Sequence, residues 1–258
     1  MLNGTICCQE SIDALHALGV HALYHDAPNY HRKQWEDMFI IQALLERGLL
    51  EPGKRGLGFA VGQEVLPAMF ATRGVEVLAS DLAVDQAAGR GWTDTAQHAA
   101  SLDHLRKPWC PDDVMDANVT FRAVDMNAVP DDLTGFDFLW STCSFEHLGS
   151  IEKGLDFVVN AMKCLRPGGW AVHTTEFNLS SNTDTLESPS TVIFRQQDME
   201  RLAERLSEIG CVMINQFSVN EMEMDRRIDF LPHTQDPHIR LQVNRYVSTS
   251  YGFTVHKL

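Results

Sequence analysis

The segment from residue 54 to residue 81 constrains the fold of this chain more than any other part of it. It reads KRGLGFAVG, then QEVLPAMFATRG, then VEVLASD. An apolar run that ends in small residues, a helix-like stretch and a second apolar run that ends in an acid are typical of a nucleotide-binding βαβ unit. Gly58, Ala60 and Gly62 let a ligand approach the backbone, and Asp81 is placed to accept hydrogen bonds from ribose hydroxyls. The same small residues could instead serve only to pack the strand against the helix.

A second segment, from Gly135 to Phe177, predicts two further strands around a helix. Its run FDFLWS is followed by apolar residues at helical spacing, from Ile151 to Leu165. The next residues, RPGG, would end that helix and turn the chain into a strand from Trp170 to Phe177. Strands and helices that alternate in this way indicate an α/β fold.

With both segments in place, the chain resembles class I methyltransferases that use S-adenosylmethionine (SAM). The resemblance rests, in this order, on the Gly58-x-Ala60-x-Gly62 turn, Asp81, the FDFLWS strand, Phe145-Glu146-His147 and LRPGG. It implies a Rossmann-like, doubly wound sheet that is mostly parallel, with SAM as the cofactor. The final strand, from Tyr246 to Val255, would be antiparallel and lie at the edge of the sheet. Two positions depart from the family pattern, since Gly56 stands where an acid is usual and Ala60 replaces the middle glycine.

The resemblance also implies which residues bind SAM. Asp125, after an expected strand from Val119 to Val124, would accept a hydrogen bond from the adenine amino group. Met126 would pack on the adenine ring, a role that suits its soft and polarizable thioether. The other implied cofactor-binding residues are Gly58, Ala60, Gly62, Asp81, Leu82, Ser141 and Trp35.

We expect the whole chain, residues 1–258, to form a single domain, because no linker or charge block divides it. Residues 1–53 would form a helical cover over the cofactor, and residues 54–258 a Rossmann-like core. A helix from about Arg32 to Gly48 belongs to this cover. It would bring three side chains near the cofactor, those of His31, Gln34 and Trp35. As an alternative, Trp35 only packs in the core.

Two insertions, at about 82–118 and 218–244, are expected to shape the pocket for the acceptor. The first would contain a helix from Thr93 to Leu105. Its tryptophans, Trp92 and Trp109, could form a wall for a ligand or anchor the insertion to the core. The second insertion contains prolines that exclude a regular helix.

The composition argues against several classes of function. With 35 acidic residues against 21 Lys and Arg, the formal charge of −14 argues against nucleic acid as a partner, because binding to phosphates needs clustered basic side chains. The sequence has no run of about 18 apolar residues for a membrane span and no signal peptide, so we expect a cytoplasmic protein. The six cysteines show no zinc-binding spacing, so we expect reduced, mostly buried thiols and no metal.

Methyl transfer from a sulfonium is an in-line displacement, and a base helps when the acceptor is a hydroxyl. His147 is one candidate for this base near neutral pH, although such a histidine can also simply hold a loop. Glu176, near the end of a strand, is the second candidate, for acceptor binding or base catalysis. His173 lies further inside the same strand and is expected to be a hydrogen-bonded core residue.

The sequence therefore predicts a SAM-dependent methyltransferase that acts on a small or medium-sized acceptor. Oxygen is the atom that we expect to be methylated. The stretch HTTEFNLSSNTDTLESPS is similar to methyltransferases found among bacterial glycan-assembly enzymes, which makes a sugar hydroxyl the leading acceptor. Three alternatives stay open: an NAD-dependent oxidoreductase, an enzyme that transfers or cyclises the alkyl arm of SAM, and a non-catalytic binding module. The oligomeric state also stays open, with a homodimer as one alternative.

Overall fold

The computed structural model describes residues 4–89, 97–217 and 221–258. Its strands are β1 (Gly4–Ile6), β2 (Arg55–Phe59), β3 (Glu76–Asp81), β4 (Val119–Ala123), β5 (Phe136–Thr142), β6 (Leu165–Asn178), β7 (Cys211–Met213), β8 (Ile228–Asp229), β9 (Arg240–Val243) and β10 (Tyr246–Lys257). Its α-helices are α1 (Gln9–Ala17), α2 (Arg32–Leu45), α3 (Leu66–Thr72), α4 (Val84–Gly89), α5 (Asp112–Asn118), α6 (Ile151–Ala161) and α7 (Gln196–Glu208).

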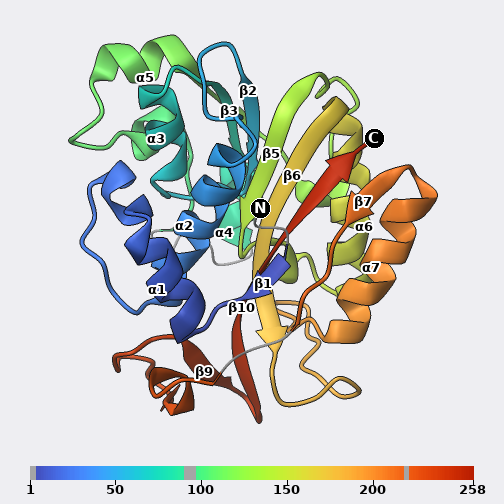
Figure 1. Cartoon of the computed structure of the whole chain (residues 1–258). Helices are drawn as coiled ribbons and strands as arrows, with labels where there is room; N and C mark the ends of the chain where they lie inside the picture. Colours follow the sequence, from blue (N-terminus) through green and yellow to red (C-terminus); the bar gives the residue numbers. More distant parts are fainter. Residues whose placement is uncertain (1–3, 90–96, 218–220) are drawn as a thin grey trace.

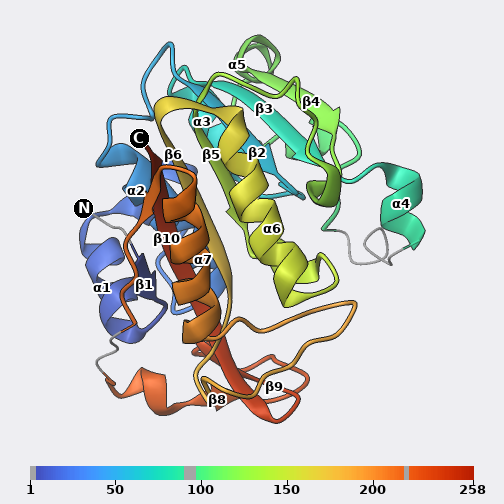
Figure 2. The ribbon, with the colours of Figure 1, turned by 90° about the vertical axis from the view of Figure 1, so that its right-hand side faces the viewer.

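Within these residues the strands form one sheet, whose main path is β4-β3-β2-β5-β6-β10-β9-β8. The strands from β4 to β6 along this path are parallel, and β10 runs antiparallel to β6. Helices α2 and α3 cover one face of the sheet, and α6 and α7 cover the other (Figures 1 and 2). The predicted doubly wound, mostly parallel sheet with an antiparallel final strand is confirmed.

The prediction that the final strand forms the edge of the sheet is wrong. On the side of β10 that faces away from β6, three short strands pair with successive parts of it, namely β9, β1 and β7. An exposed edge of a long strand would leave a row of unpaired N–H and C=O groups. These groups are satisfied by pieces of chain from the N-terminal region, from the second insertion and from the segment after α7.

The core has two halves, one on each face of the sheet, because successive side chains of a strand alternate between the faces. On β5, Trp140 points toward α3, where its ring centroid lies 5.0 Å from that of Phe70. Leu139, between Phe138 and Trp140, belongs to the other half of the core. There the ring of Phe157 on α6 lies 5.1 Å from that of Phe59 on β2. The apolar strands of the βαβ unit are thus buried on both sides, as expected for a parallel sheet.

The LRPGG sequence takes a different structure from the predicted turn. A 3₁₀ turn, Met162–Cys164, follows α6, and β6 begins directly at Leu165. Residues 165–169 therefore belong to the strand, with a register shift opposite Phe136 and Phe138. Gly168, with φ of +76°, makes this irregularity possible, because glycine adopts the left-handed region without steric cost.

The first insertion contains α4, a 3₁₀ turn at Leu102–Leu105 and α5, so the expected helix from Thr93 to Leu105 is wrong where the chain is described. Residues 97–100 are not helical, because His98 and Ala99 bond to the end of β3 instead. The Trp109 ring lies 5.1 Å from the His25 ring, which favours the anchoring role. Trp92 and residues 93–96 lie outside the described residues.

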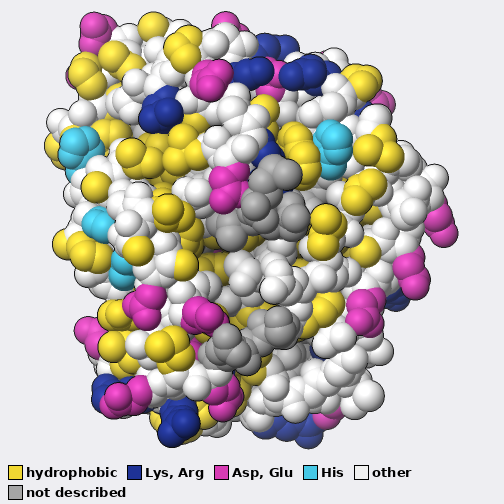
Figure 3. All heavy atoms as spheres, in the orientation of Figure 1, with side chains coloured by type: hydrophobic (Ala, Val, Ile, Leu, Met, Phe, Trp, Pro, Cys, Tyr) yellow, Lys and Arg dark blue, Asp and Glu magenta, His cyan; other side chains and the backbone are white. Residues whose placement is uncertain are grey.

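The second insertion, described from residue 221 onward, adds β8 and β9 beside the start of β10 (Figure 1). It also reaches the beginning of α2, where the rings of His31 and His238 are stacked with centroids 4.3 Å apart. Among the helices of the described residues, none combines the length and the apolar character needed to cross a membrane. On the face shown in Figure 3, Lys and Arg side chains lie in small groups near the top and the bottom, among acidic and apolar ones.

Candidate functional site

A cavity of about 640 Å³ lies at the carboxyl ends of the parallel strands, where open α/β sheets bind ligands. The predicted cofactor-binding residues that line it are Ala60, Gly62, Asp81, Leu82, Asp125 and Met126. Both catalytic candidates, His147 and Glu176, line it as well. The structure therefore brings together residues from the carboxyl ends of five strands, β2 to β6. It does not bring Gly58, Ser141 or Trp35 to the cavity wall.

The turn after β2 has a backbone conformation that side chains rarely adopt. Ala60 has φ of +48° and Gly62 has φ of +50°. A Cβ atom on Gly62 would lie 2.3 Å from the carbonyl oxygen of Gln97, so only glycine fits here. Gly58 is expected from the sequence to let a ligand approach the backbone, but a Cβ atom there would lie 2.4 Å from the Trp140 ring. Its missing side chain makes room for Trp140, not for a ligand.

Asp81 at the end of β3 is already hydrogen-bonded to the backbone. Its carboxylate accepts N–H groups from Gly62 at 3.1 Å, Leu82 at 2.7 Å and Ala99 at 3.0 Å. Burial raises the pKa of Asp81, and these backbone hydrogen bonds counteract the rise. A carboxylate has about four acceptor positions, so this arrangement leaves about one of them for a ligand hydroxyl. Asp81 thus fixes the turn and lines the cavity at the same time.

Two of the residues outside the cavity are buried in the core. Ser141 is fully buried and its Oγ lies 2.7 Å from Nδ1 of His173. Burial lowers the pKa of His173 to about 3, which agrees with the predicted core role, although its Nε2 has no partner among the described residues. Trp35 is fully buried too, with its ring stacked on Phe39 at 5.4 Å. Neither Ser141 nor Trp35 lines the cavity.

The cover helix α2 contacts the cavity with a different face from the one predicted. Arg32, Lys33 and Asp37 line the cavity, whereas Gln34 bonds to Asp26 and to the backbone of Ala27. A helix has 3.6 residues per turn, so Arg32, Lys33, Glu36 and Asp37 form one polar stripe. This stripe was visible in the sequence as a periodic polar pattern, and it was the signal that the prediction missed.

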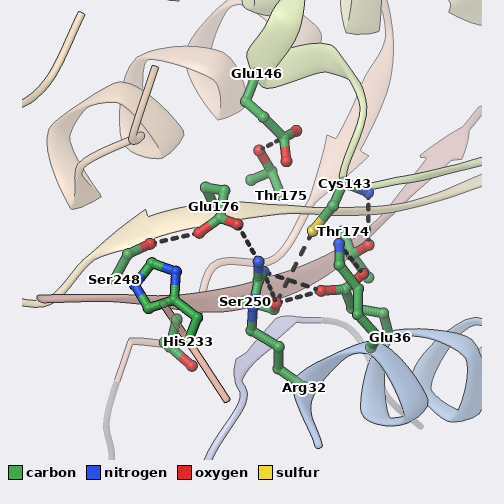
Figure 4. A network of polar contacts seen from close by, with 12 residues as sticks. Arg32, Glu36, Cys143, Glu146, Thr174, Thr175, Glu176, His233, Ser248 and Ser250 are labelled. Atoms are coloured by element: carbon green, nitrogen blue, oxygen red, sulfur yellow. Dashed lines mark hydrogen bonds and ion pairs between the residues drawn. The ribbon is translucent and has the colours of Figure 1, made fainter. Parts of the chain in front are cut away.

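The stripe forms a buried network of charges with the sheet (Figure 4). Nη2 of Arg32 lies 2.6 Å from Oε1 of Glu176, and Nη1 lies 3.3 Å from Oε1 of Glu36. Lys33 also pairs with Glu36, and Ser250 of β10 donates a hydrogen bond to Oε1 of Glu36. Burial opposes the charge on Glu36, but Lys33 and Arg32 outweigh it and hold its pKa below the usual range.

The two catalytic candidates differ in their surroundings. Both oxygens of Glu176 are engaged, because Oε2 accepts a hydrogen bond from Ser248 at 2.6 Å and Oε1 pairs with Arg32. Nδ1 of His147 lies 2.8 Å from the carbonyl oxygen of Ser190. A carbonyl oxygen only accepts, so Nδ1 carries a proton, and Nε2 is the basic nitrogen of the neutral ring.

The acidic residue that the family pattern has at position 56 would not fit in this structure, where Gly56 stands. A Cβ atom on Gly56 would lie 2.5 Å from the Phe138 ring. Near the turn, the cavity is instead lined by Asp37 and Glu64. Nε1 of Trp140 donates to Oε1 of Glu64 at 2.6 Å, yet burial raises the pKa of Glu64 to about 8. Burial, with the nearby Glu64, also raises the pKa of Asp37.

Among the described residues, no group of three or more His, Cys, Asp or Glu side chains is arranged to hold a metal ion. The six cysteines are free and buried, as predicted. Cys143 alone of them lines the cavity. Burial raises the pKa of its thiol, and Glu36 adds to this effect. The ionisable groups that line the cavity are therefore carboxyls, the cationic side chains of Arg32 and Lys33, the Cys143 thiol, and two histidines, His98 and His147.

No protein-family model and no curated protein sequence matches this chain. One solved structure similar to it is a protein of Galdieria sulphuraria provisionally assigned as a sarcosine dimethylglycine methyltransferase. The identity is 15% and the TM-score 0.55, over 96% of this chain and 98% of that chain. Another is the magnesium protoporphyrin IX methyltransferase of Synechocystis with bound SAH, at 12% identity and a TM-score of 0.48, over 97% of this chain and 87% of that chain. The first likeness shows that this chain has the class I methyltransferase fold.

Proposed function

We propose that this chain is a SAM-dependent methyltransferase that methylates an oxygen atom, such as a sugar hydroxyl, of a small or medium-sized acceptor. The observation that carries the proposal is the convergence of Ala60, Gly62, Asp81, Asp125 and Met126 on one cavity in a sheet of this fold. These residues come from segments after three different strands. The likeness in fold supports the same conclusion.

The cavity residues fit SAM in charge and in shape. The wall includes the acidic side chains of Asp37, Glu64, Asp81 and Asp125. Burial raises the pKa of Asp37 and of Glu64, and a sulfonium or ammonium group bound beside them would favour their charged forms. The remaining acceptor position of Asp81 suits a ribose hydroxyl. Leu82 and Met126 supply apolar surface for a flat ring.

When bound, SAM supplies a methyl group on a positively charged sulfur. The residues of this chain then act mainly by positioning. Glu176, held by Arg32 and Ser248, presents a fixed carboxylate to the acceptor. His147, partly exposed at the rim, is placed to exchange a proton with solvent through Nε2. No residue of this chain needs to form a covalent bond with the acceptor.

We also propose a cytoplasmic protein without a nucleic-acid partner that works in bacterial glycan assembly. The excess of acidic residues, with a formal charge of −14, supports the absence of a nucleic-acid partner. The proposed organisation is one domain, with residues 1–53 as the cover of the core. A homodimer remains the proposed alternative to a monomer, and sedimentation of the purified protein decides between them.

The test is a reaction with methyl-labelled SAM and the small-molecule extract of the source cells, followed by mass spectrometry. We expect S-adenosylhomocysteine and a methylated hydroxyl compound as products. Methylthioadenosine would instead show transfer of the alkyl arm. A thermal shift with NAD but not with S-adenosylhomocysteine would favour an oxidoreductase. Calorimetry that detects no SAM binding would favour a binding module.

A further inference from the structure

Glu146 lies at the cavity wall in a rigid part of the chain. It belongs to the 3₁₀ turn Phe145–His147 after β5, and its exposed fraction is 0%. Its carbonyl oxygen accepts the N–H of Val192 at 2.9 Å, and the neighbouring Phe145 ring packs against Phe194 with centroids 5.0 Å apart. These contacts hold the turn on both sides. Glu146 therefore lines the cavity from a fixed backbone.

The two carboxyl oxygens of Glu146 have different surroundings (Figure 4). Oε2 accepts a hydrogen bond from Oγ1 of Thr175 at 3.1 Å. Oε1 is buried and has no hydrogen-bond partner among the described residues. Native proteins rarely leave a buried polar atom without a partner unless a ligand or a catalytic role accounts for it. Oε1 is therefore the atom that a bound acceptor would meet.

Glu146 also differs from the neighbouring Glu176 in its ionic partners. An arginine pairs with Glu176, whereas no cationic side chain is hydrogen-bonded to Glu146 in the described part of the chain. Burial is the main cause that raises the pKa of Glu146. His147 and Lys33 lower it, and Glu176 adds to the rise. Two carboxyl groups with such different surroundings can take different roles, and the more basic one is the better proton acceptor.

We propose that Glu146 is the base that takes the proton of the acceptor on Oε1. This inference rests on the methyl transfer to a hydroxyl proposed above. A lone pair of the acceptor oxygen forms the new bond to the methyl carbon, while the carbon–sulfur bond breaks and its electron pair stays on sulfur. The hydroxyl proton passes to Oε1, and Glu146 becomes a neutral carboxylic acid. Thr175 is the positioning residue that holds Oε2.

The first test is label transfer from methyl-labelled SAM to the small-molecule extract of the source cells, with the variant Glu146→Gln. Glutamine keeps the size and the hydrogen bond to Thr175 but cannot take a proton. We expect the rate to fall about 10²–10⁴-fold, while the affinity for S-adenosylhomocysteine stays unchanged. Glu146→Asp keeps a carboxylate and should retain part of the rate. Glu208→Gln, an exposed change on α7, serves as the control that leaves the rate unchanged.

The second test follows the carboxyl directly, by NMR titration of protein with ¹³C-labelled glutamate carboxyls. Besides the resonance of Glu64, we expect a second resonance that titrates above the ordinary value of about 4.3, and only this second one should be missing from Glu146→Gln. A Glu146→Gln variant with the wild-type rate would overturn the inference, and so would an ordinary titration of Glu146. If the wild type transfers no label, the proposed function itself fails. The titration still decides whether Glu146 has the basicity that a base requires.

Discussion

Arg32 on α2 and Glu176 on β6 form a buried ion pair, with Nη2 and Oε1 2.6 Å apart. The side chains are 9% and 13% exposed, so water screens their attraction only weakly. The pair connects the N-terminal cover to the sheet beneath the cavity. The position of the cover therefore depends on a strand that lies far away in the sequence.

Breaking this ion pair should destabilise the protein strongly. Arg32→Met removes the cationic partner of Glu176 and leaves Glu36 with Lys33 alone, and removal of one partner of a buried pair costs about 3–5 kcal/mol. Urea unfolding measures this loss. Combining Arg32→Met with Glu176→Gln should cost less than the sum of the single changes, because the pair is lost only once. Strict additivity would mean that the two side chains do not interact.

Asp81→Ala should affect both stability and cofactor binding. The change removes the acceptor of three backbone N–H groups, and hydrogen bonds to charged groups contribute about 1.5–3 kcal/mol each. We expect a lower melting temperature and at least about tenfold weaker binding of S-adenosylhomocysteine in calorimetry. A variant that is less stable but binds normally would show that Asp81 only fixes the turn.

Gly62→Ala should displace residues 97–99 from the turn. The new methyl group would lie 2.3 Å from the carbonyl oxygen of Gln97. Gly19→Ala is a matched control, because Gly19 also has positive φ, +70°, but has nothing within 4 Å of the added Cβ. The control measures the backbone strain alone. We expect a larger drop in melting temperature, and weaker SAM binding, only for Gly62→Ala; equal effects would argue against the contact.

Glu64 should make the protein less stable at alkaline pH. Its folded-state pKa of about 8 lies above the unfolded value, so the folded state holds the proton more tightly. This stabilising contribution is complete below the unfolded pKa of about 4.3 and is lost as the pH rises through about 8. Glu64→Gln keeps an acceptor for Trp140 and should reduce the loss of stability between about pH 6 and about pH 9. An unchanged pH profile in urea unfolding would contradict the assigned pKa.

The parallel sheet could be predicted from the sequence because its signals are local. Apolar runs that end in small or acidic residues define β2 and β3, and the helical spacing from Ile151 onward defines α6. The positions of Asp81 and Asp125 at the cavity follow from the same pattern, because the carboxyl ends of parallel strands meet at one edge.

The wrong assignments in the site depend on contacts between distant segments. Trp35 and Arg32 lie on different faces of one helix, and the face that meets the cavity is decided by Glu176 and Ser250, which come much later in the chain. Gly58 leaves space for Trp140 of the neighbouring strand β5. Ser141 faces His173 because of the register between β5 and β6. None of these partners can be identified from spacing alone.

The pairing of β1 with β10 has a consequence for synthesis of the protein. Ile6 in the first strand lies opposite Tyr251 in the last one. Translation proceeds from the N-terminus, so residues 4–6 leave the ribosome long before their partner exists. The first strand cannot pair with β10 until residues 251–253 have been made. The sheet can therefore close on this side only after residues 251–253 have emerged from the ribosome, and residues 4–6 stay open to other contacts until then.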